Sequence, residues 1–306
     1  MSMDNKPKIV VVAGTNASGK SGLGIELARK FNGEIVSADS RQVYRRLNLG
    51  SGKVTEEEMK GVPHHLLDVR NPGEFFSMAD FQLLAYQAIE DILARGKVPF
   101  LVGGTGLYVD AVAQGYVLSG KMPDLAYRAE LEKLTTEELW SRLSAQMPQT
   151  QVDPRNRNRV MRMLEKIHDG DDGIPTKSPR YESLYLGVTW ERQELCRRID
   201  ERLQRRLDQG MVEEVRVLLE EGVSEEFMLK LGLEYKFLTQ YLLGQYAALE
   251  EMQELLATAI KQFAKRQMIW WRRNKSIHWL DMTGDPVQEA SRLVESYLKG
   301  SAEEEA

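Results

Sequence analysis

The chain has 306 residues, a formal net charge of −5, and 42% hydrophobic residues. This length allows one large domain or two smaller ones, and the one cysteine, Cys196, excludes an internal disulfide framework and a cysteine-rich structural zinc module. No apolar run approaches the roughly 18 residues of a membrane span, so we expect a cytoplasmic protein with no membrane partner.

Positive charge is segregated along the chain in spite of the acidic average. Residues 261–280 contain no acidic residue but hold Lys261, Lys265, Arg266, Arg272, Arg273 and Lys275. A second cluster consists of Arg155, Arg157, Arg159 and Arg162. Because phosphate binding depends on lysine and arginine, a nucleic-acid partner is not excluded.

The first hundred residues alternate between strand and helix patterns. Residues 8–13 (KIVVVA) predict a buried strand, residues 21–31 a helix, and residues 34–37 a second strand. Ser77 and Asp80 form the pattern of a capping box before a helix that ends near Gly96, and residues 98–102 predict a third strand. This order predicts an α/β fold with a mostly parallel sheet.

The middle of the chain has helical patterns only, at residues 125–134, 137–146 and 156–168. Strand-like sequence returns at 185–188 and 277–280, with helices predicted at 192–207 and 257–273. We therefore expect the first part of the core at 1–116, a helical insertion at 117–183, the second part of the core with C-terminal helices at 184–300, and a disordered tail at 301–306. Residues 170–179 are rich in turn formers and predict a mobile segment.

The strongest motif is GTNASGKS at residues 14–21, which satisfies GxxxxGK[ST] between a predicted strand and a predicted helix. Its glycines let backbone N–H groups surround a phosphate, Lys20 reaches the terminal phosphoryl oxygens, and the Ser21 hydroxyl can hold Mg²⁺. The predicted diphosphate-binding residues are Gly14, Thr15, Asn16, Ala17, Ser18, Gly19, Lys20 and Ser21. Kinases, NTPases and transferases with diphosphate leaving groups all need such a loop, so it does not identify the reaction.

The second predicted strand leads into ADSRQVY at residues 38–44. Asp39 therefore lies at the carboxyl edge of the predicted sheet, near Lys20, where open α/β sheets bind ligands. A carboxylate there can hold a metal, cap the following turn or act as a general base. The residues alone leave these roles open.

Together these motifs resemble the tRNA dimethylallyltransferases, also called tRNA isopentenyltransferases, of bacterial type. The resemblance extends over most of the chain and is specific because the blocks occur in the family's order. Besides residues 14–21 and 38–44, the blocks are PHHLLDV at 63–69, FSMADF at 76–81, VGGTGLY at 102–108, RNRVMRMLE at 157–165, RRIDERL at 197–203 and AKRQMIWWRR at 264–273. The fold it implies is a P-loop NTPase-like core with a helical insertion domain.

The resemblance implies transfer of a dimethylallyl group from dimethylallyl diphosphate to the exocyclic N6 amine of the adenosine 3′-adjacent to the tRNA anticodon. Asp39 matches the family's general base, and Lys20, Arg202 and Mg²⁺ on Ser21 match the groups that stabilise the leaving diphosphate. The positions matching tRNA-binding residues are Asp39, Ser40, Arg41, Gln42, Thr105, Arg128, Asn158, Arg159, Val160, Met161 and Arg162.

Several features depart from the family's pattern or have two interpretations. Residues 231–236 (LGLEYK) replace a form nearer Gly-Tyr-Lys-Glu, so the contribution of this segment is open. We expect Arg205 and Arg206 to lie on a solvated helix face. Packing is favoured over base stacking for Trp270 and Trp271, and His64 and His65 have a structural interpretation because no metal-ligand cluster accompanies them.

Three other functions fit parts of the sequence. A P-loop small-molecule kinase would use ATP, with Asp39 activating an acceptor hydroxyl; the basic insertion argues against it. An RNA-binding protein without catalysis would use the loop only to sense a ligand. Prenyl transfer to a free adenine nucleotide would keep the chemistry without the tRNA. We expect the tRNA anticodon stem-loop as partner and a monomeric enzyme.

Overall fold

The structure, a computed structural model, describes residues 6–118, 124–170 and 176–300. It divides into two compact units, one made of Met1–Gly115 with Pro179–Ala306 and the other of Tyr116–Ser178. Residues 179–183, which we assigned to the insertion, belong to the first unit because strand β5 (Glu182–Thr189) pairs with β1 (Lys8–Ala13) from its first residue. The predicted tail at 301–306, and residues 171–175 of the turn-rich segment, lie outside the described residues.

Within the described residues, the first unit holds a six-stranded sheet in the order β3-β2-β4-β1-β5-β6. Every pairing is parallel, which confirms the predicted fold class. The remaining strands are β2 (Gly33–Ser37), β3 (His64–His65), β4 (Val98–Gly103) and β6 (Ile277–Asp281). Because β4 lies between β1 and β2, the loops after these three strands meet at one edge of the sheet.

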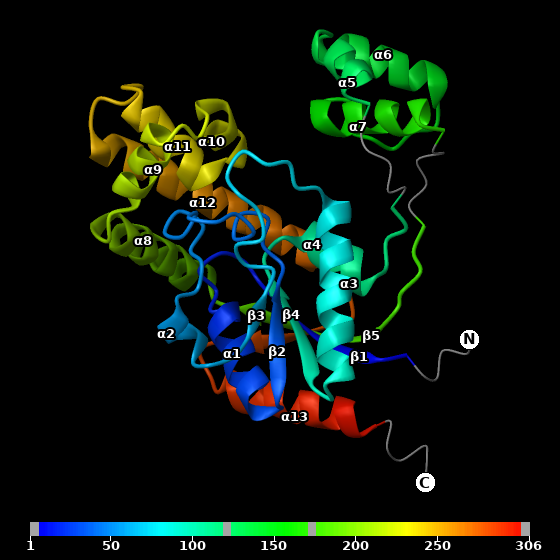
Figure 1. Cartoon of the computed structure of the whole chain (residues 1–306), viewed down its shortest axis with the longest axis vertical. Helices are drawn as coiled ribbons and strands as arrows, with labels where there is room; N and C mark the ends of the chain where they lie inside the picture. Colours follow the sequence, from blue (N-terminus) through cyan, green and yellow to red (C-terminus); the bar gives the residue numbers. More distant parts are fainter. Residues whose placement is uncertain (1–5, 119–123, 171–175, 301–306) are drawn as a thin grey trace. The chain divides into compact units, whose positions relative to one another are not determined.

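Helices cover both faces of the sheet (Figure 1). Ile9 and Val11 pack with α3 (Met78–Ala94) and α4 (Gly106–Ala113), whereas Val10 and Val12 pack with α1 (Lys20–Lys30) and α13 (Pro286–Lys299). Burial on both faces explains why β1 is apolar throughout. The predicted capping box of Ser77 and Asp80 is present at the start of α3.

A third hydrophobic cluster joins five helices that follow β5. They are α8 (Arg192–Asp208), α9 (Met211–Glu220), α10 (Glu225–Leu231), α11 (Leu233–Leu242) and α12 (Leu249–Trp271). The loop after β2 contributes Val43 and Leu47 to this cluster, and the short helix α2 (Glu56–Met59) follows that loop. The sequence patterns did not reveal α9, α10, α11 or α13.

The second unit contains α5 (Leu125–Glu132), α6 (Thr136–Gln146) and α7 (Arg157–His168), the three helices expected there. Leu131, Leu139 and Leu164 are fully buried and form its own core. A capping box of Thr135 and Glu138 begins α6.

A buried carboxylate, that of Glu34, lies near the start of β2, the strand that leads into Asp39. The side chain of Glu34 in β2 is 1% exposed and accepts hydrogen bonds from Arg95 and Lys97, with His65 of β3 2.7 Å away. Hydrogen bonds from Arg95, which outweigh the opposing effect of burial, hold the pKa of Glu34 well below its ordinary value.

Replacing Glu34 by glutamine should therefore lower the free energy of unfolding at pH 7 by about 2 kcal/mol, because Arg95 and Lys97 lose the carboxylate that pairs with both of them. A depressed folded-state pKa adds stability that is complete above the unfolded pKa and is lost as the pH falls. Urea unfolding at several pH values should show the difference between Glu34→Gln and wild type shrinking between roughly pH 5 and pH 3. A difference that stays constant over this range would contradict the assignment.

Candidate functional site

The loop between β1 and α1 has the conformation of a phosphate-binding loop. Gly19 (φ 88°) precedes α1 and has no side chain to cap it, so the first-turn N–H groups of α1 are left for an anion. Lys20 Nζ donates to the Thr15 carbonyl over 3.2 Å, which folds the lysine back over the loop. Gly14 is required because a Cβ atom there would collide with Val188 and Ser18.

Two side chains hold the loop from behind. Arg198 of α8 donates from Nε to the carbonyl of Ala17 over 3.1 Å, and the Trp190 indole donates to the carbonyl of Ser18 over 2.8 Å. Arg198 also lies over the Trp190 ring, 4.4 Å from its centroid. Ala17 has a left-handed backbone (φ 59°), an unfavourable conformation for a residue with a Cβ atom. These bonds to the carbonyls of Ala17 and Ser18 therefore stabilise this backbone conformation of the loop.

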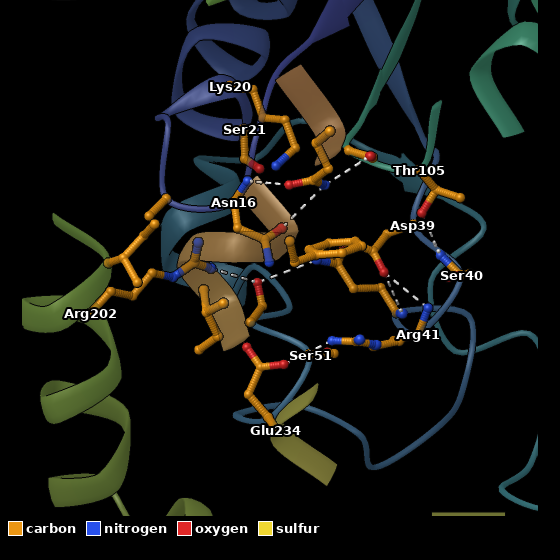
Figure 2. Close-up of a pocket in the computed structure, with 18 of the residues that line it drawn as sticks. Asn16, Lys20, Ser21, Asp39, Ser40, Arg41, Ser51, Thr105, Arg202 and Glu234 are labelled. Carbon is orange, nitrogen blue, oxygen red and sulfur yellow. Dashed lines mark hydrogen bonds and ion pairs between the residues drawn. The ribbon is translucent and has the colours of Figure 1, made fainter. Parts of the chain in front are cut away.

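The loop opens into a pocket of about 380 Å³ at the carboxyl edge of the sheet (Figure 2). In this view Arg202 enters from one side, and Asp39 and Thr105 lie on the other. The walls come from the loops after β1, β2 and β4 and from helices α8, α11 and α12. Predicted residues that line it are Asn16, Ala17, Lys20, Ser21, Asp39, Ser40, Arg41, Gln42, Thr105 and Arg202.

Asp39 belongs to a tight turn that presents one of its oxygens. Its Oδ1 accepts from the backbone N–H groups of Arg41 at 2.9 Å and Gln42 at 3.4 Å. Within the described part of the chain, Oδ2 has no hydrogen-bond partner. Capping of the turn by one oxygen therefore leaves the other oxygen of this carboxylate available for a second role. The Thr105 hydroxyl accepts from the Ser40 N–H over 3.2 Å, which joins the loops after β2 and β4.

The pocket concentrates positive charge where solvent access is low. Burial and the neighbouring charge of Arg202 lower the pKa of Lys20 to about 8. Burial and the charge of Arg206 likewise lower the pKa of Arg202 to about 10. An anion reverses both effects, so the pocket is built for a strongly anionic group.

Arg206 was expected on a solvated face, and this prediction is wrong. Its side chain is 11% exposed and lines the pocket, while Arg205 is exposed as predicted. The signal was available, because Arg198, Arg202 and Arg206 are spaced four residues apart and so share one face of α8.

Gly52 lies where the two guanidinium groups meet. Its carbonyl accepts from Arg202 Nη2 and Gln42 Nε2, each over 3.3 Å. A Cβ atom at this position would collide with Nη2 of both Arg202 and Arg206, and the backbone is left-handed (φ 62°).

Gln267 of α12 lines the pocket, and sequence reasoning missed it. Its Oε1 accepts from the Asn16 N–H over 2.9 Å, and its Nε2 donates to the Gly104 carbonyl over 2.9 Å. It therefore ties the phosphate-binding loop to the loop after β4. It lies within the block at 264–273, where attention went to the tryptophans and arginines.

The two tryptophans have different environments. Trp271 is 1% exposed and packs in the core beneath the sheet, which confirms the packing interpretation. Trp270 lines the pocket, and its indole donates to Asp110 Oδ2 over 3.0 Å while Arg273 lies over its ring.

In the helical unit, the five residues of α7 predicted to bind tRNA differ in solvent exposure. Asn158, Arg159 and Arg162 are exposed, but Val160 and Met161 are 0% and 5% exposed and pack in the core of the unit. The prediction that Val160 and Met161 bind tRNA is therefore wrong for their side chains, because one face of α7 must pack.

Two of the predicted basic residues share a buried carboxylate. Glu165, 4% exposed in its side chain, lies 3.3 Å from Arg128 and 3.0 Å from Arg162. Glu165 therefore holds the side chains of Arg128 and Arg162 on one surface of the helical unit.

His64 and His65 do not form part of a metal-binding cluster among the described residues. His64 Nδ1 lies 2.8 Å from the Val62 carbonyl, and His65 contacts Glu34. In the residues that the structure describes, no group of three or more His, Cys, Asp or Glu side chains is arranged to hold a metal ion.

The parallel sheet, the loop at residues 14–21 and the cationic pocket beside it define a P-loop α/β protein. The profile of a family described as IPP transferase matches residues 42–274. The chain belongs to this IPP transferase family.

Named relatives agree over nearly the whole length. The chain is 45% identical to tRNA dimethylallyltransferase 2 of Shewanella sediminis, covering 94% of this chain and 97% of that protein. It is 38% identical to tRNA dimethylallyltransferase of Anoxybacillus flavithermus, with 92% and 93% covered.

Solved structures share the fold. The full-length tRNA isopentenylpyrophosphate transferase of Bacillus halodurans is 35% identical with a TM-score of 0.76, covering 98% of this chain and 99% of that chain. A eukaryotic dimethylallyltransferase, described as acting on tRNA, is 27% identical with a TM-score of 0.83, covering 96% and 80%. Among the described residues, no helix is long and apolar enough to cross a membrane.

Replacing Gly52 by alanine should weaken binding of inorganic pyrophosphate about tenfold, because the added methyl group displaces both guanidinium groups. Isothermal titration calorimetry measures this directly. Gly61→Ala is the matched control, since Gly61 is also left-handed (φ 77°) but has nothing within 4 Å of its added Cβ atom. Equal losses in the two variants would attribute the effect to backbone strain and contradict the steric explanation.

The lowered pKa of Lys20 predicts a pH dependence of anion binding. Pyrophosphate needs the protonated amine, which the free protein loses as the pH rises through about 8. Calorimetry at pH 7 and pH 9.5 should show an affinity loss of about tenfold with proton uptake at the higher pH. Lys20→Met should bind weakly at both pH values and lack this step. A wild-type affinity that does not change between the two would rule out Lys20 as the titrating group.

Proposed function

We propose that this chain transfers the dimethylallyl group of dimethylallyl diphosphate to the exocyclic N6 amine of the adenosine 3′-adjacent to the anticodon of a tRNA, releasing diphosphate. The observation that carries the proposal is the presence of Asp39 in the same pocket as Lys20 and Arg202. The site thus pairs a base with preplaced cations, as an alkyl transfer with an anionic leaving group requires.

The chemistry follows from these positions. The N6 lone pair attacks C1 of the allylic chain while the bond from C1 to the diphosphate oxygen breaks and its electron pair stays with the diphosphate. Asp39 accepts the proton that N6 loses, which matters because the amine lone pair is delocalised into the purine. Lys20, Arg202 and the first-turn backbone N–H groups of α1 stabilise the charge gained by the leaving group.

The residues present suit a magnesium ion as well. Ser21 and Asp39 border a small cavity of about 20 Å³ beside Lys20 and supply oxygen donors, and Mg²⁺ is often held by one or two protein oxygens together with substrate phosphates. We assign the ion to the Ser21 hydroxyl. When bound, the magnesium ion would place positive charge beside the departing diphosphate.

The nucleotide side of the pocket is formed by the loop after β2. Ser40, Arg41 and Gln42 line the pocket together with Thr105, next to Asp39. An adenine amine stacked in an anticodon loop is out of reach, so the target base must be extruded into this space.

Polar and basic side chains on the surface of the helical unit provide the second element of tRNA binding. Arg128, Asn158, Arg159 and Arg162 offer contacts to phosphates, which position an RNA without reading its sequence. We further propose that the enzyme acts as a monomer in the cytoplasm, where its tRNA substrates are found.

Replacing Asp39 by asparagine should lower the rate of prenyl transfer by about two to four orders of magnitude, because the amide cannot accept the proton. The amide oxygen still accepts from the Arg41 and Gln42 N–H groups, so tRNA affinity should change less than about twofold. Mass spectrometry of nucleosides from tRNA incubated with dimethylallyl diphosphate measures the product, and gel-shift titration measures tRNA binding. Asp91→Asn, on the exposed surface of α3, is the control.

The same assays, together with incubation of the protein with labelled ATP and a metabolite pool, separate the alternatives. Wild-type turnover in Asp39→Asn would refute the role of base. Label transfer from ATP to a metabolite in place of prenyl transfer would favour the kinase, and salt-dependent tRNA binding without product would favour an RNA-binding protein.

A further inference from the structure

The segment at residues 231–236, which departs from the family's common form, contributes a buried carboxylate to the pocket. Glu234 lies in the first turn of α11 and its side chain is 4% exposed. Its Oε2 lies 2.8 Å from Arg41 Nη1 and its Oε1 lies 3.2 Å from Arg206 Nη1. Figure 2 shows Glu234 facing Arg41 at the rim of the pocket.

We infer that Glu234 is a positioning residue, which holds Arg206 beside Arg202 so that both guanidinium groups face one diphosphate. The inference deepens the proposed function and rests on it in taking a diphosphate as the ligand. Its two carboxylate oxygens are engaged by Arg41 and Arg206, so Glu234 acts through these arginines.

The geometry at Gly52 supports this role. Glu234 engages Nη1 of Arg206, while Nη2 of Arg206 and Nη2 of Arg202 both lie against Gly52. Because the guanidinium groups of Arg202 and Arg206 lie close together, they repel each other. This repulsion contributes to the lowered pKa of Arg202. A fixed carboxylate on the far side of Arg206 offsets this repulsion and keeps the arginine in place.

The next residue along α11 reinforces the arrangement. Tyr235 is fully buried, its ring packs on Gly50, and its hydroxyl donates to Glu214 over 3.0 Å. Glu214 in turn accepts from the backbone N–H groups of residues 48–50. One turn of α11 therefore sets both Arg206 and the loop that presents the Gly52 carbonyl to Arg202.

The alternative is that Glu234 matters only through its charge, and the two roles predict opposite signs. A carboxylate that merely lowers the positive potential of the pocket weakens anion binding, so its removal tightens the binding of pyrophosphate. A carboxylate that positions Arg206 strengthens binding, so its removal weakens it. Glu234→Asp keeps the charge but shortens the reach by one methylene.

The test is isothermal titration of the full chain with inorganic pyrophosphate. Glu234→Asp and Glu234→Gln should each raise the dissociation constant about tenfold, and so should Arg206→Met. The double variant Glu234→Gln with Arg206→Met should lose little more than either single variant, because both changes remove the same interaction. Glu226→Gln on α10, which breaks the exposed pair with Lys230, is the control and should bind as wild type.

Wild-type affinity in Glu234→Asp, tighter binding in Glu234→Gln, or wild-type affinity in Arg206→Met would overturn the inference. Arg206→Met leaves Glu234 paired with Arg41, so it remains a test if the Glu234 variants do not fold. In the prenylation assay, Glu234→Asp should raise KM for dimethylallyl diphosphate more than it lowers kcat, a split that general loss of structure does not produce. Pyrophosphate binding needs no tRNA, so a wild-type protein that binds pyrophosphate but makes no product refutes the proposed function alone.

Discussion

Mutual repulsion among cations in a pocket of low solvent access is the constraint on which the site depends. Lys20 and Arg202 each have a lowered pKa, caused by burial and by a neighbouring positive charge. Such a pocket is unfavourable when empty and becomes favourable when a multivalent anion enters. The free energy that folding spends on gathering these charges is therefore recovered on binding, and most fully by a group whose negative charge grows during the reaction.

The rest of the unit keeps these charges in place. Arg198 and Trp190 hold the carbonyls of the phosphate-binding loop from behind, and Gln267 links that loop to Gly104. Each tie comes from an element far along the sequence, and each satisfies a backbone group that would otherwise be buried without a partner. The C-terminal helices therefore complete a site whose central motif lies near the amino terminus.

In the proposed mechanism Asp39 combines two roles, turn cap and general base, that reasoning from the residues had treated as alternatives. One oxygen caps the turn and so fixes the side chain, which lines the pocket. The other oxygen has no hydrogen-bond partner among the described residues. A base held in this way loses little conformational entropy when the substrate arrives. The link between Ser40 and Thr105 extends the same rigidity to the next loop.

Local patterns predicted much of this protein. The alternation of apolar strands with helices predicted the parallel sheet, and the spacing of residues 14–21 predicted the phosphate-binding loop, because each depends on neighbours in the chain. Asp39 was placed near Lys20 by a general property of parallel sheets, whose strand ends share an edge. The resemblance to a family supplied Arg202 and the exposed residues of α7.

The sequence by itself thus determined the fold class, the anion-binding loop and the family. Only the tertiary structure decided which face of α8 enters the pocket, that Val160 and Met161 turn inward, and that Glu234 and Gln267 meet residues about 30 to 250 positions away. The physical reason is that a helix has several faces of similar composition, and which of them packs depends on distant elements that leave no periodic signal in the chain.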